Sequence, residues 1–159
     1  MAERVYSADV RRFWSTFCDE NGVDPDLPYD AFAFGDSAEM ADELLAVVLH
    51  GPKRATAGLL ADYGEDESLP EVGFHSIVLG GDGRPACVIR TTEVRVLPFR
   101  EVDEAFAWDE GEGDRSLAYW LDAHVGFCTR MCAARGETFS EEMPTVFERF
   151  TLVWPKESR

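Results

Sequence analysis

The chain has 159 residues, the length of one ordinary domain, and 45% of them are hydrophobic, which is enough for a packed core and excludes global disorder. No run approaches the ~20 apolar residues that span a bilayer, and no apolar run follows a basic patch at the N-terminus, so we expect a cytoplasmic protein with no membrane partner. The formal net charge of −16 excludes a broad basic face for nucleic-acid phosphates, so a nucleic-acid function requires a local basic pocket or a small ligand such as a nucleoside.

Two helices are predicted in the first third of the chain. Ser7 can cap the first, of about residues 7–21, whose apolar residues recur at helical spacing and which Gly22 ends. Pro25 and Pro28 indicate a loop after it.

The second predicted helix begins near Asp36, where Asp36 and Glu39 form a capping-box pattern, and it ends at Gly51-Pro52. Lys53 follows directly. It is the one lysine outside the C-terminal tail, since the chain has 13 arginines and only two lysines. A desolvated lysine can release its proton, which an arginine does not do in proteins, so we interpret Lys53 as a functional amine.

Strands dominate the middle of the predicted fold. Residues 62–71 are acidic and lack periodicity, which indicates a loop. Residues 74–79 and 86–97 are predicted strands, and the glycine-rich segment 80–83 between them indicates a hairpin turn.

The last third returns to helix and then to strand. Residues 102–108 are predicted as a short helical turn, and the glycine-rich residues 110–114 as an irregular loop. Asp114 can cap a helix that ends near Arg135, and residues 145–154 alternate as a final strand. Helices thus flank a mainly antiparallel set of strands, which predicts an α+β fold whose sheet curls into a small barrel.

Lys53, Thr56 and Glu93 supply an amine, a hydroxyl and a carboxylate. A metal-free hydrolytic site needs such groups as proton acceptor, nucleophile and proton donor. A salt bridge between Lys53 and Glu93, with Thr56 an ordinary strand residue, explains the same residues. Spacing alone favours this second interpretation, because ion pairs outnumber active sites.

Three motifs carry a resemblance to a known family. They are G-x-K-x-x-T after the second helix, I-x-T-T-E-V in the long strand, and E-G-E-G-D-x-S-L-x-x-W at residues 110–120. Together they resemble the ASCH family over about residues 34–154. The resemblance implies a PUA-like small β-barrel with flanking helices, and a single ASCH domain over residues 1–159 whose N-terminal helix packs on the core.

The resemblance also implies a cleft for RNA or a nucleoside. Small members of the family are amidohydrolases that remove the acetyl group from N4-acetylcytidine. In them the motif lysine accepts a proton, the threonine is the nucleophile and the strand glutamate donates a proton. Carried over by motif position, these catalytic roles fall on Lys53, Thr56 and Glu93. Larger members, which this chain matches better in length and in its E-G-E-G-D segment, have been linked to RNA cleavage.

The chemistry constrains these roles. Lysine has an ordinary pKa of about 10.4, so Lys53 needs desolvation, or a proton shared with Glu93, to act as a base. If Lys53 stays cationic, it can instead stabilise an oxyanion or a phosphorane. A ribose 2′-hydroxyl would then attack in place of Thr56.

Four further residues are predicted to bind substrate. Arg54 and Arg90 are candidate phosphate contacts, although a surface ion pair explains each equally well. Ser116, near the start of the last helix, is a candidate to face the cleft, and Phe34 is a further candidate for substrate binding.

No metal or cofactor is expected. The acidic residues 110–114 lack the spacing of an EF-hand and are interpreted as a turn before a capped helix. His124, Cys128 and Cys132 share one helical face, a pattern that zinc sites use. The apolar residues on that face favour buried reduced thiols and a core histidine instead.

We rank an RNA-binding protein with ribonuclease-type hydrolysis first, because the architecture of the family weighs more than the net charge. The alternatives are a nucleoside amidohydrolase, which the acidic surface favours, and a non-catalytic RNA-binding or interaction module. The expected partner is therefore RNA, a nucleoside or a nucleotide.

Overall fold

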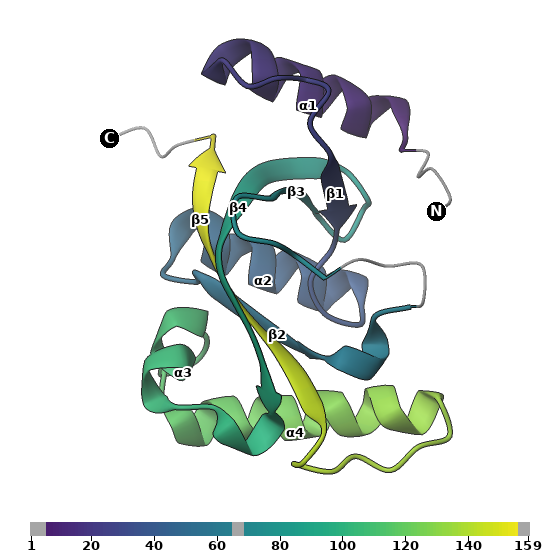
Figure 1. The fold of residues 1–159 in the computed structure, drawn as a ribbon, viewed down its shortest axis with the longest axis vertical. Helices are drawn as coiled ribbons and strands as arrows, with labels where there is room; N and C mark the ends of the chain where they lie inside the picture. The colour runs from purple at the N-terminus through teal and green to yellow at the C-terminus, as the bar shows by residue number, and fades with distance from the viewer. Residues whose placement is uncertain (1–5, 65–68, 156–159) are drawn as a thin grey trace.

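A computed structural model describes residues 6–64 and 69–155 of the chain. Within them, four α-helices surround one five-stranded sheet (Figure 1). The helices are α1 (Ala8–Asn21), α2 (Ala38–His50), α3 (Glu104–Glu110) and α4 (Leu117–Ala134). The strands are β1 (Tyr29–Phe32), β2 (Ala55–Leu59), β3 (His75–Leu79), β4 (Pro85–Pro98) and β5 (Pro144–Trp154). Two short 3-10 helices, η1 (Leu60–Asp62) and η2 (Phe99–Glu101), follow β2 and β4.

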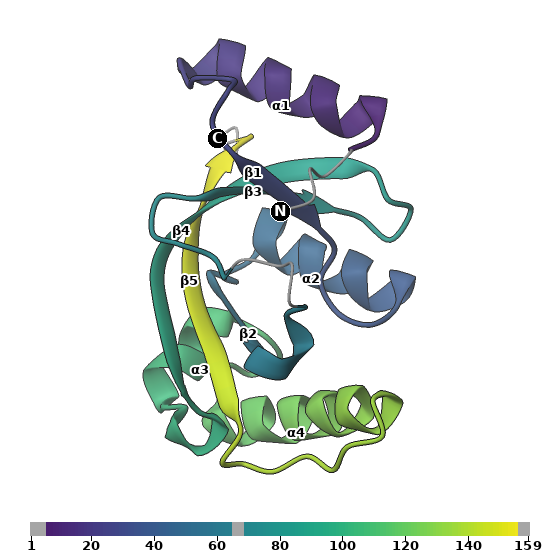
Figure 2. The same cartoon turned by 45° about the vertical axis from the view of Figure 1, so that its right-hand side comes forward.

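The sheet is mixed and open. Its strand order is β1-β3-β4-β5-β2, in which β1 and β3 are parallel and the other three pairings are antiparallel. Within the described residues, no pairing joins the two edge strands β1 and β2. The predicted small barrel is therefore not confirmed. The edge strands have only four and five residues, and the sheet curls without closing (Figure 1, Figure 2).

The long strands β4 and β5 give the sheet two faces with different neighbours. On β5, Phe147 packs with residues of α3 and α4, whereas Phe150 packs with residues of α2. We call these the outer face and the inner face. Trp14 and Phe17 of α1 pack with Ile77 of β3 at one end of the sheet. Figure 2 shows α1 and α4 at opposite ends of the molecule, with α2 between them.

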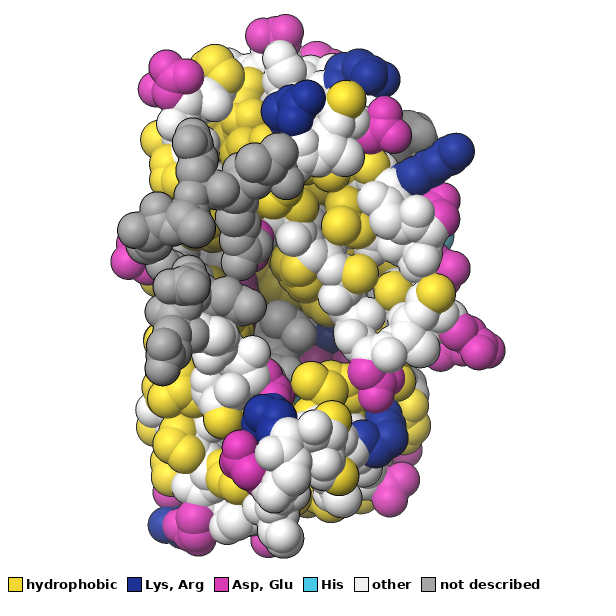
Figure 3. Space-filling view, turned by 90° about the vertical axis from the view of Figure 1, so that its right-hand side faces the viewer, with side chains coloured by type: hydrophobic (Ala, Val, Ile, Leu, Met, Phe, Trp, Pro, Cys, Tyr) yellow, Lys and Arg dark blue, Asp and Glu magenta, His cyan; other side chains and the backbone are white. Residues whose placement is uncertain are grey.

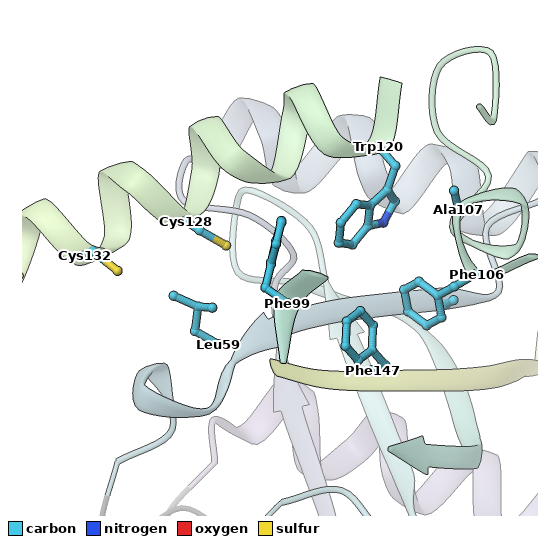
Figure 4. Packing of buried hydrophobic residues seen from close by; sticks show 9 residues of the cluster. Leu59, Phe99, Phe106, Ala107, Trp120, Cys128, Cys132 and Phe147 are labelled. Atoms are coloured by element: carbon cyan, nitrogen blue, oxygen red, sulfur yellow. The ribbon is translucent and has the colours of Figure 1, made fainter. Parts of the chain in front are cut away.

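The core beneath α3 and α4 is aromatic (Figure 4). The ring centroids of Phe99 and Trp120 are 5.3 Å apart, and those of Phe106 and Phe147 are 5.0 Å apart with the rings nearly perpendicular. Such contacts bury large apolar areas and hold α4 against the sheet. No helix in the described parts of the chain is long and apolar enough to cross a membrane.

Most predicted elements are present near their expected bounds. Ser7 caps α1 through its hydroxyl, and Gly22 ends the helix in the left-handed conformation, as predicted. The two predicted central strands and the hairpin turn between them correspond to β3 and β4. The predicted loop of residues 62–71 includes residues 65–68, which lie outside the described residues.

Two predicted caps need correction. α2 is capped by Ser37 and not by Asp36, because the Ser37 hydroxyl accepts the backbone N–H three residues further on. α4 is capped in the same way by Ser116 and not by Asp114, whose carboxylate accepts the backbone N–H of Ser116 in the preceding turn. The two edge strands, β1 and β2, are not predicted from sequence, because four or five residues show too little periodicity.

Trp14 connects α1 to the rest of the fold. Its indole N–H donates to the carbonyl of Pro25 at 3.0 Å, and its ring stacks on Tyr29 of β1. We expect Trp14→Ala to lower the free energy of unfolding by about 3–5 kcal/mol, because it leaves a cavity in a packed cluster. Urea denaturation measures this loss. The exposed Thr16 gives a control, since Thr16→Ala should change stability by less than about 0.5 kcal/mol. Equal losses in both variants would contradict the packing of α1.

Candidate functional site

Lys53 is a buried cation with three hydrogen-bond acceptors. It follows α2 directly, and its side chain is only 1% exposed. Its ammonium donates to Ala55 O at 2.8 Å, to Glu110 Oε1 at 2.8 Å and to Glu112 Oε2 at 2.9 Å, so all three N–H groups are satisfied. Burial alone would lower the pKa of Lys53, but the charges and hydrogen bonds of the two glutamates raise it above the ordinary lysine value.

Glu110, the last residue of α3, is the buried anion of the site and is also 1% exposed. Its Oε1 accepts from Lys53. Its Oε2 accepts from Trp120 Nε1 at 2.6 Å and lies 3.0 Å from His124 Nε2. Burial would raise the pKa of this carboxyl, but the charges of Lys53 and His124 hold the pKa of Glu110 well below its usual range. Glu110 is therefore an anion at every physiological pH.

His124 is placed between two acceptors. Its Nδ1 lies 2.9 Å from Trp120 O, which can only accept, and its Nε2 faces the Glu110 carboxylate. Both ring nitrogens therefore act as donors, and only the charged imidazolium carries a proton on each of them. Burial lowers the pKa of His124, but the charge of Glu110 and its hydrogen bond outweigh this and raise it. We call Lys53, Glu110, Glu112, Trp120 and His124 the Lys53 centre.

Glu112 is the carboxyl of this centre that reaches the surface, with 18% of its side chain exposed. Burial and the neighbouring Glu110 anion raise the pKa of Glu112, against the opposing effect of Lys53. The environment thus moves the pKa values of two adjacent carboxyls apart. That arrangement suits a proton-transferring group beside a fixed anion.

Gly111 allows the acidic loop to approach Lys53. Its φ is 69°, in the left-handed region, and a Cβ at this position would lie 2.7 Å from Lys53 N and 2.8 Å from the carbonyl carbon of Pro52. A side chain would therefore displace the loop. The segment 110–114 is a turn, as the sequence indicates, but it also supplies the two carboxylates that hold Lys53. The sequence interpretation missed this second role, although the long motif that contains Glu110 and Glu112 was the available signal.

Glu93 contacts Arg149, and within the described residues no ion pair joins it to Lys53. Its carboxylate lies 2.6 Å from Arg149 Nη1, and Arg149 Nε also contacts Asp109 of α3 at 2.8 Å. The cause is a β-bulge between Thr91 and Glu93, where one residue of β4 has no partner on β5. Thr91 pairs with Phe150 on the inner face, but Glu93 pairs with Arg149 on the outer face.

Thr56 lies on β2, half-buried, and faces a different carboxyl. In the pairing of β2 with β5 it stands directly opposite Glu148. Paired residues of antiparallel strands project from the same face, so Thr56 and Glu148 share the inner face. The roles of Lys53, Thr56 and Glu93 as acceptor, nucleophile and donor stay predictions.

Within the described residues, the two predicted phosphate-binding arginines make no hydrogen bond to a side chain of the Lys53 centre. Arg54 is half-buried, and its Nη1 donates to the backbone carbonyls of Val48 and Lys53 at 3.1 and 2.6 Å. These bonds hold the turn that follows α2. Arg90 is exposed on β4, opposite His75 of β3. Phosphate binding by either residue stays a prediction.

Of the other two predicted contacts, Phe34 is in the site and Ser116 is beside it. The Lys53 ammonium lies 5.2 Å from the centroid of the buried Phe34 ring, a cation–π distance. The same ring packs against Phe150 on the inner face. Ser116 is half-buried, and its hydroxyl accepts from Tyr119 N as the cap of α4.

Two groups of side chains could in principle bind a metal ion: the cysteines of α4, and the carboxylates and imidazole of the Lys53 centre. Cys128 and Cys132 are buried in the core under α4, and burial raises the pKa of Cys128 to about 12, which disfavours the thiolate that zinc needs. Ligand atoms of Glu110, Glu112 and His124 lie within 4.8 Å of one another, close enough for a metal ion. The Lys53 ammonium already contacts both carboxylates, so a metal ion there would have to displace it.

A family model of the ASCH domain matches residues 30–154, which include the Lys53 centre and all five strands apart from the first residue of β1. The chain belongs to the ASCH family. ASCH domains generally bind RNA and have a PUA-like fold, here with an open sheet. No match is found among curated proteins.

Two solved structures support this membership. An ASCH domain from Lactobacillus crispatus JV V101 has 32% sequence identity and a TM-score of 0.75, with 91% of each chain covered. Protein EF3133 from Enterococcus faecalis V583 has 37% identity and a TM-score of 0.81, covering 91% of this chain and 88% of the other. The two structures thus share both fold and sequence with this chain over nearly its whole length.

Lys53 and Glu110 form a buried ion pair whose loss should be costly. We expect Lys53→Met to lower the free energy of unfolding by about 3–5 kcal/mol, because it removes one of the two cations beside the buried Glu110 anion and the donor to its Oε1. Adding Glu110→Gln to Lys53→Met should recover part of that loss. Urea denaturation of the two single variants and the double variant measures the coupling. Arg100→Met, which breaks an exposed ion pair with Glu142, should cost no more than about 1 kcal/mol. Strictly additive effects would contradict the pairing.

The charged state of His124 predicts a pH dependence. Because the folded pKa of His124 is raised above its unfolded value, its stabilisation is complete below about pH 6.5 and is lost as pH rises through the folded pKa. The stability difference between wild type and His124→Gln should therefore shrink as the pH rises above about 6.5. His75, whose pKa is lowered by burial and by Arg90, is present in both proteins and cancels in this difference. Urea denaturation at each pH measures the effect, and a difference that grows with pH would contradict it.

Proposed function

We propose that this ASCH domain binds single-stranded RNA and cleaves it by metal-independent chemistry, with Glu112 as the group that transfers the proton. The observation that carries the proposal is Glu112 itself. It is a surface-reaching carboxyl with a raised pKa, held against a buried Lys53 cation and the fixed Glu110 anion. A general acid or base is most effective when its pKa lies near the working pH.

In this proposal the ribose 2′-hydroxyl is the nucleophile, and the enzyme moves protons to and from the reacting oxygens. Glu112 is bonded to Lys53 and to Glu110, and 18% of its side chain is exposed, so it is the carboxyl of the centre that a substrate can reach. Lys53 is too buried to touch a phosphate, and its three donors are occupied, so it is a positioning residue that keeps both glutamates in place. His124 has the same task, since both its ring nitrogens face acceptors within the centre.

The Lys53 side chain is therefore not the proton acceptor in this scheme. A neutral lysine would remove one of the two cations beside Glu110, and the pKa of Lys53 is raised rather than lowered. Both points favour a cationic Lys53, whose buried charge holds the carboxyl groups of Glu110 and Glu112 in place.

A short fluorescent single-stranded RNA tests the proposal. Wild type should bind it, seen as fluorescence anisotropy, and cleave it in the presence of EDTA. We expect Glu112→Gln to lower the cleavage rate constant by about 10²–10⁴-fold while binding is retained, because a positioned acid or base supplies that much. Glu43→Gln, an exposed glutamate on α2, removes the same charge elsewhere and should leave the rate unchanged.

The outcomes separate the candidate functions. RNA binding without cleavage by wild type would leave a non-catalytic RNA-binding module and would contradict the proposed chemistry. Cleavage that survives in Glu112→Gln would remove Glu112 from its role. Cleavage that EDTA abolishes would assign a metal ion to the cluster of Glu110, Glu112 and His124.

A second candidate function is hydrolysis of an amide on a modified nucleoside. The net charge of −16 favours it, because long-range repulsion penalises a polyanion far more than an uncharged nucleoside. Release of acetate from N4-acetylcytidine by wild type, lost in Lys53→Ala, would establish this function in place of RNA cleavage.

A further inference from the structure

We infer that Glu148, Thr56 and Thr91 form a site on the inner face of the sheet that recognises the hydrogen-bonding edge of a nucleobase. This inference deepens the proposed RNA function by naming residues that contact the base. It also identifies Glu148 as the carboxyl opposite Thr56 in the sheet. The family resemblance instead groups Thr56 with the carboxyl of Glu93.

The register of the sheet brings the three residues together. Thr56 of β2 stands opposite Glu148 of β5. From the other side, Thr91 Oγ1 of β4 donates to Glu148 Oε2 at 2.7 Å. Glu148 therefore lies between two threonines on three adjacent strands, and all three side chains project from the inner face.

Glu148 is buried with few partners, which distinguishes it from a structural carboxyl. It is 8% exposed, and Thr91 is the one side chain in the described parts of the chain that donates a hydrogen bond to it. Glu110, by comparison, has Lys53, Trp120 and His124 around its two oxygens. A buried carboxyl that keeps one oxygen without a protein donor has capacity for a ligand.

The charge around Glu148 suits a neutral ligand with hydrogen-bonding groups. Burial and the nearby Asp30 carboxylate raise the pKa of Glu148, against the opposing hydrogen bond of Thr91. A carboxyl that is neutral offers an O–H donor, and the Thr56 hydroxyl beside it both donates and accepts. The edge of a nucleobase presents donors and acceptors side by side, so the two sets of groups match.

Two of the three residues keep some exposed surface. Glu148 is 8% exposed and Thr56 is half-buried. Figure 3 shows a hollow between the upper and lower parts of the molecule, with hydrophobic side chains beside it. The buried rings of Phe34 and Phe150 pack together on the same face and make the surroundings of Glu148 apolar.

Binding of base-bearing and abasic RNA tests the inference. Two probes are used, a short single-stranded RNA and an abasic strand with the same phosphates. Wild type should prefer the base-bearing strand. Glu148→Leu should reduce that preference by about 5–150-fold, the discrimination that a well-placed contact to a base edge supplies, and leave abasic binding unchanged. Thr56→Val, which removes a hydroxyl from a half-buried edge-strand residue, should act in the same direction.

Stability separates this role from a structural one. Glu148→Leu alone leaves the buried Thr91 hydroxyl without its acceptor, so it is combined with Thr91→Val, and the double variant should keep or raise the free energy of unfolding in urea. A carboxyl that serves the fold would instead lose stability along with binding, and that result would overturn the inference. Thr92→Val, at the exposed bulge of β4, and Glu141→Leu, at an exposed turn, are the matched controls and should match wild type.

Titration of free nucleosides by calorimetry shows whether the site takes its base from RNA or from a free nucleoside. It also separates the proposed base site from the proposed RNA function. If wild type binds RNA but the Glu148 and Thr56 variants keep its preference for bases, the base site is wrong and the RNA function stands. If wild type binds no RNA but binds a free nucleoside through Glu148, the base site stands and the RNA function is wrong. Binding of neither ligand overturns both.

Discussion

The buried ammonium of Lys53 is the constraint on which the site depends. An ion this far from water is stable only when its donors are satisfied and its charge is balanced, and here two carboxylates and one carbonyl meet both needs. Glu110 transmits the constraint, because the same carboxylate accepts from Trp120 of the aromatic core and faces His124. One set of charges therefore aligns the end of α2, the end of α3 and the start of α4 with the sheet.

The bulge in β4 is the second determinant, because it decides which face each polar residue occupies. In a regular strand Thr91 and Glu93 would project from one face. With the extra residue between them, Thr91 joins Glu148 on the inner face, and Glu93 joins Arg149 on the outer face. The bulge thus separates the Glu93 carboxylate from the Glu148 carboxyl, which lies on the opposite face of the sheet.

Local signals in the sequence predicted most of the fold. Ser7 and Gly22 bound α1 because capping depends on single residues, and the glycine-rich turn between β3 and β4 is equally local. The ASCH motifs predicted the family and contain both Lys53 and the acidic segment, but the contact between these two was not predicted. Strand register is set by packing across the whole sheet, so neither the bulge nor the pairing of Thr56 with Glu148 could be predicted. The contact of Glu93 with Arg149 was not predicted for the same reason.

The distance in sequence between the partners of the Lys53 centre has a kinetic consequence. Lys53 and Glu110 are 57 residues apart, so their contact closes a long loop whose entropy must be overcome first. Local helices and the β3–β4 hairpin have no such barrier and form earlier. Contacts made after the rate-limiting barrier act mainly on the unfolding rate. The charged centre therefore governs how long the native molecule persists more than how fast it is reached.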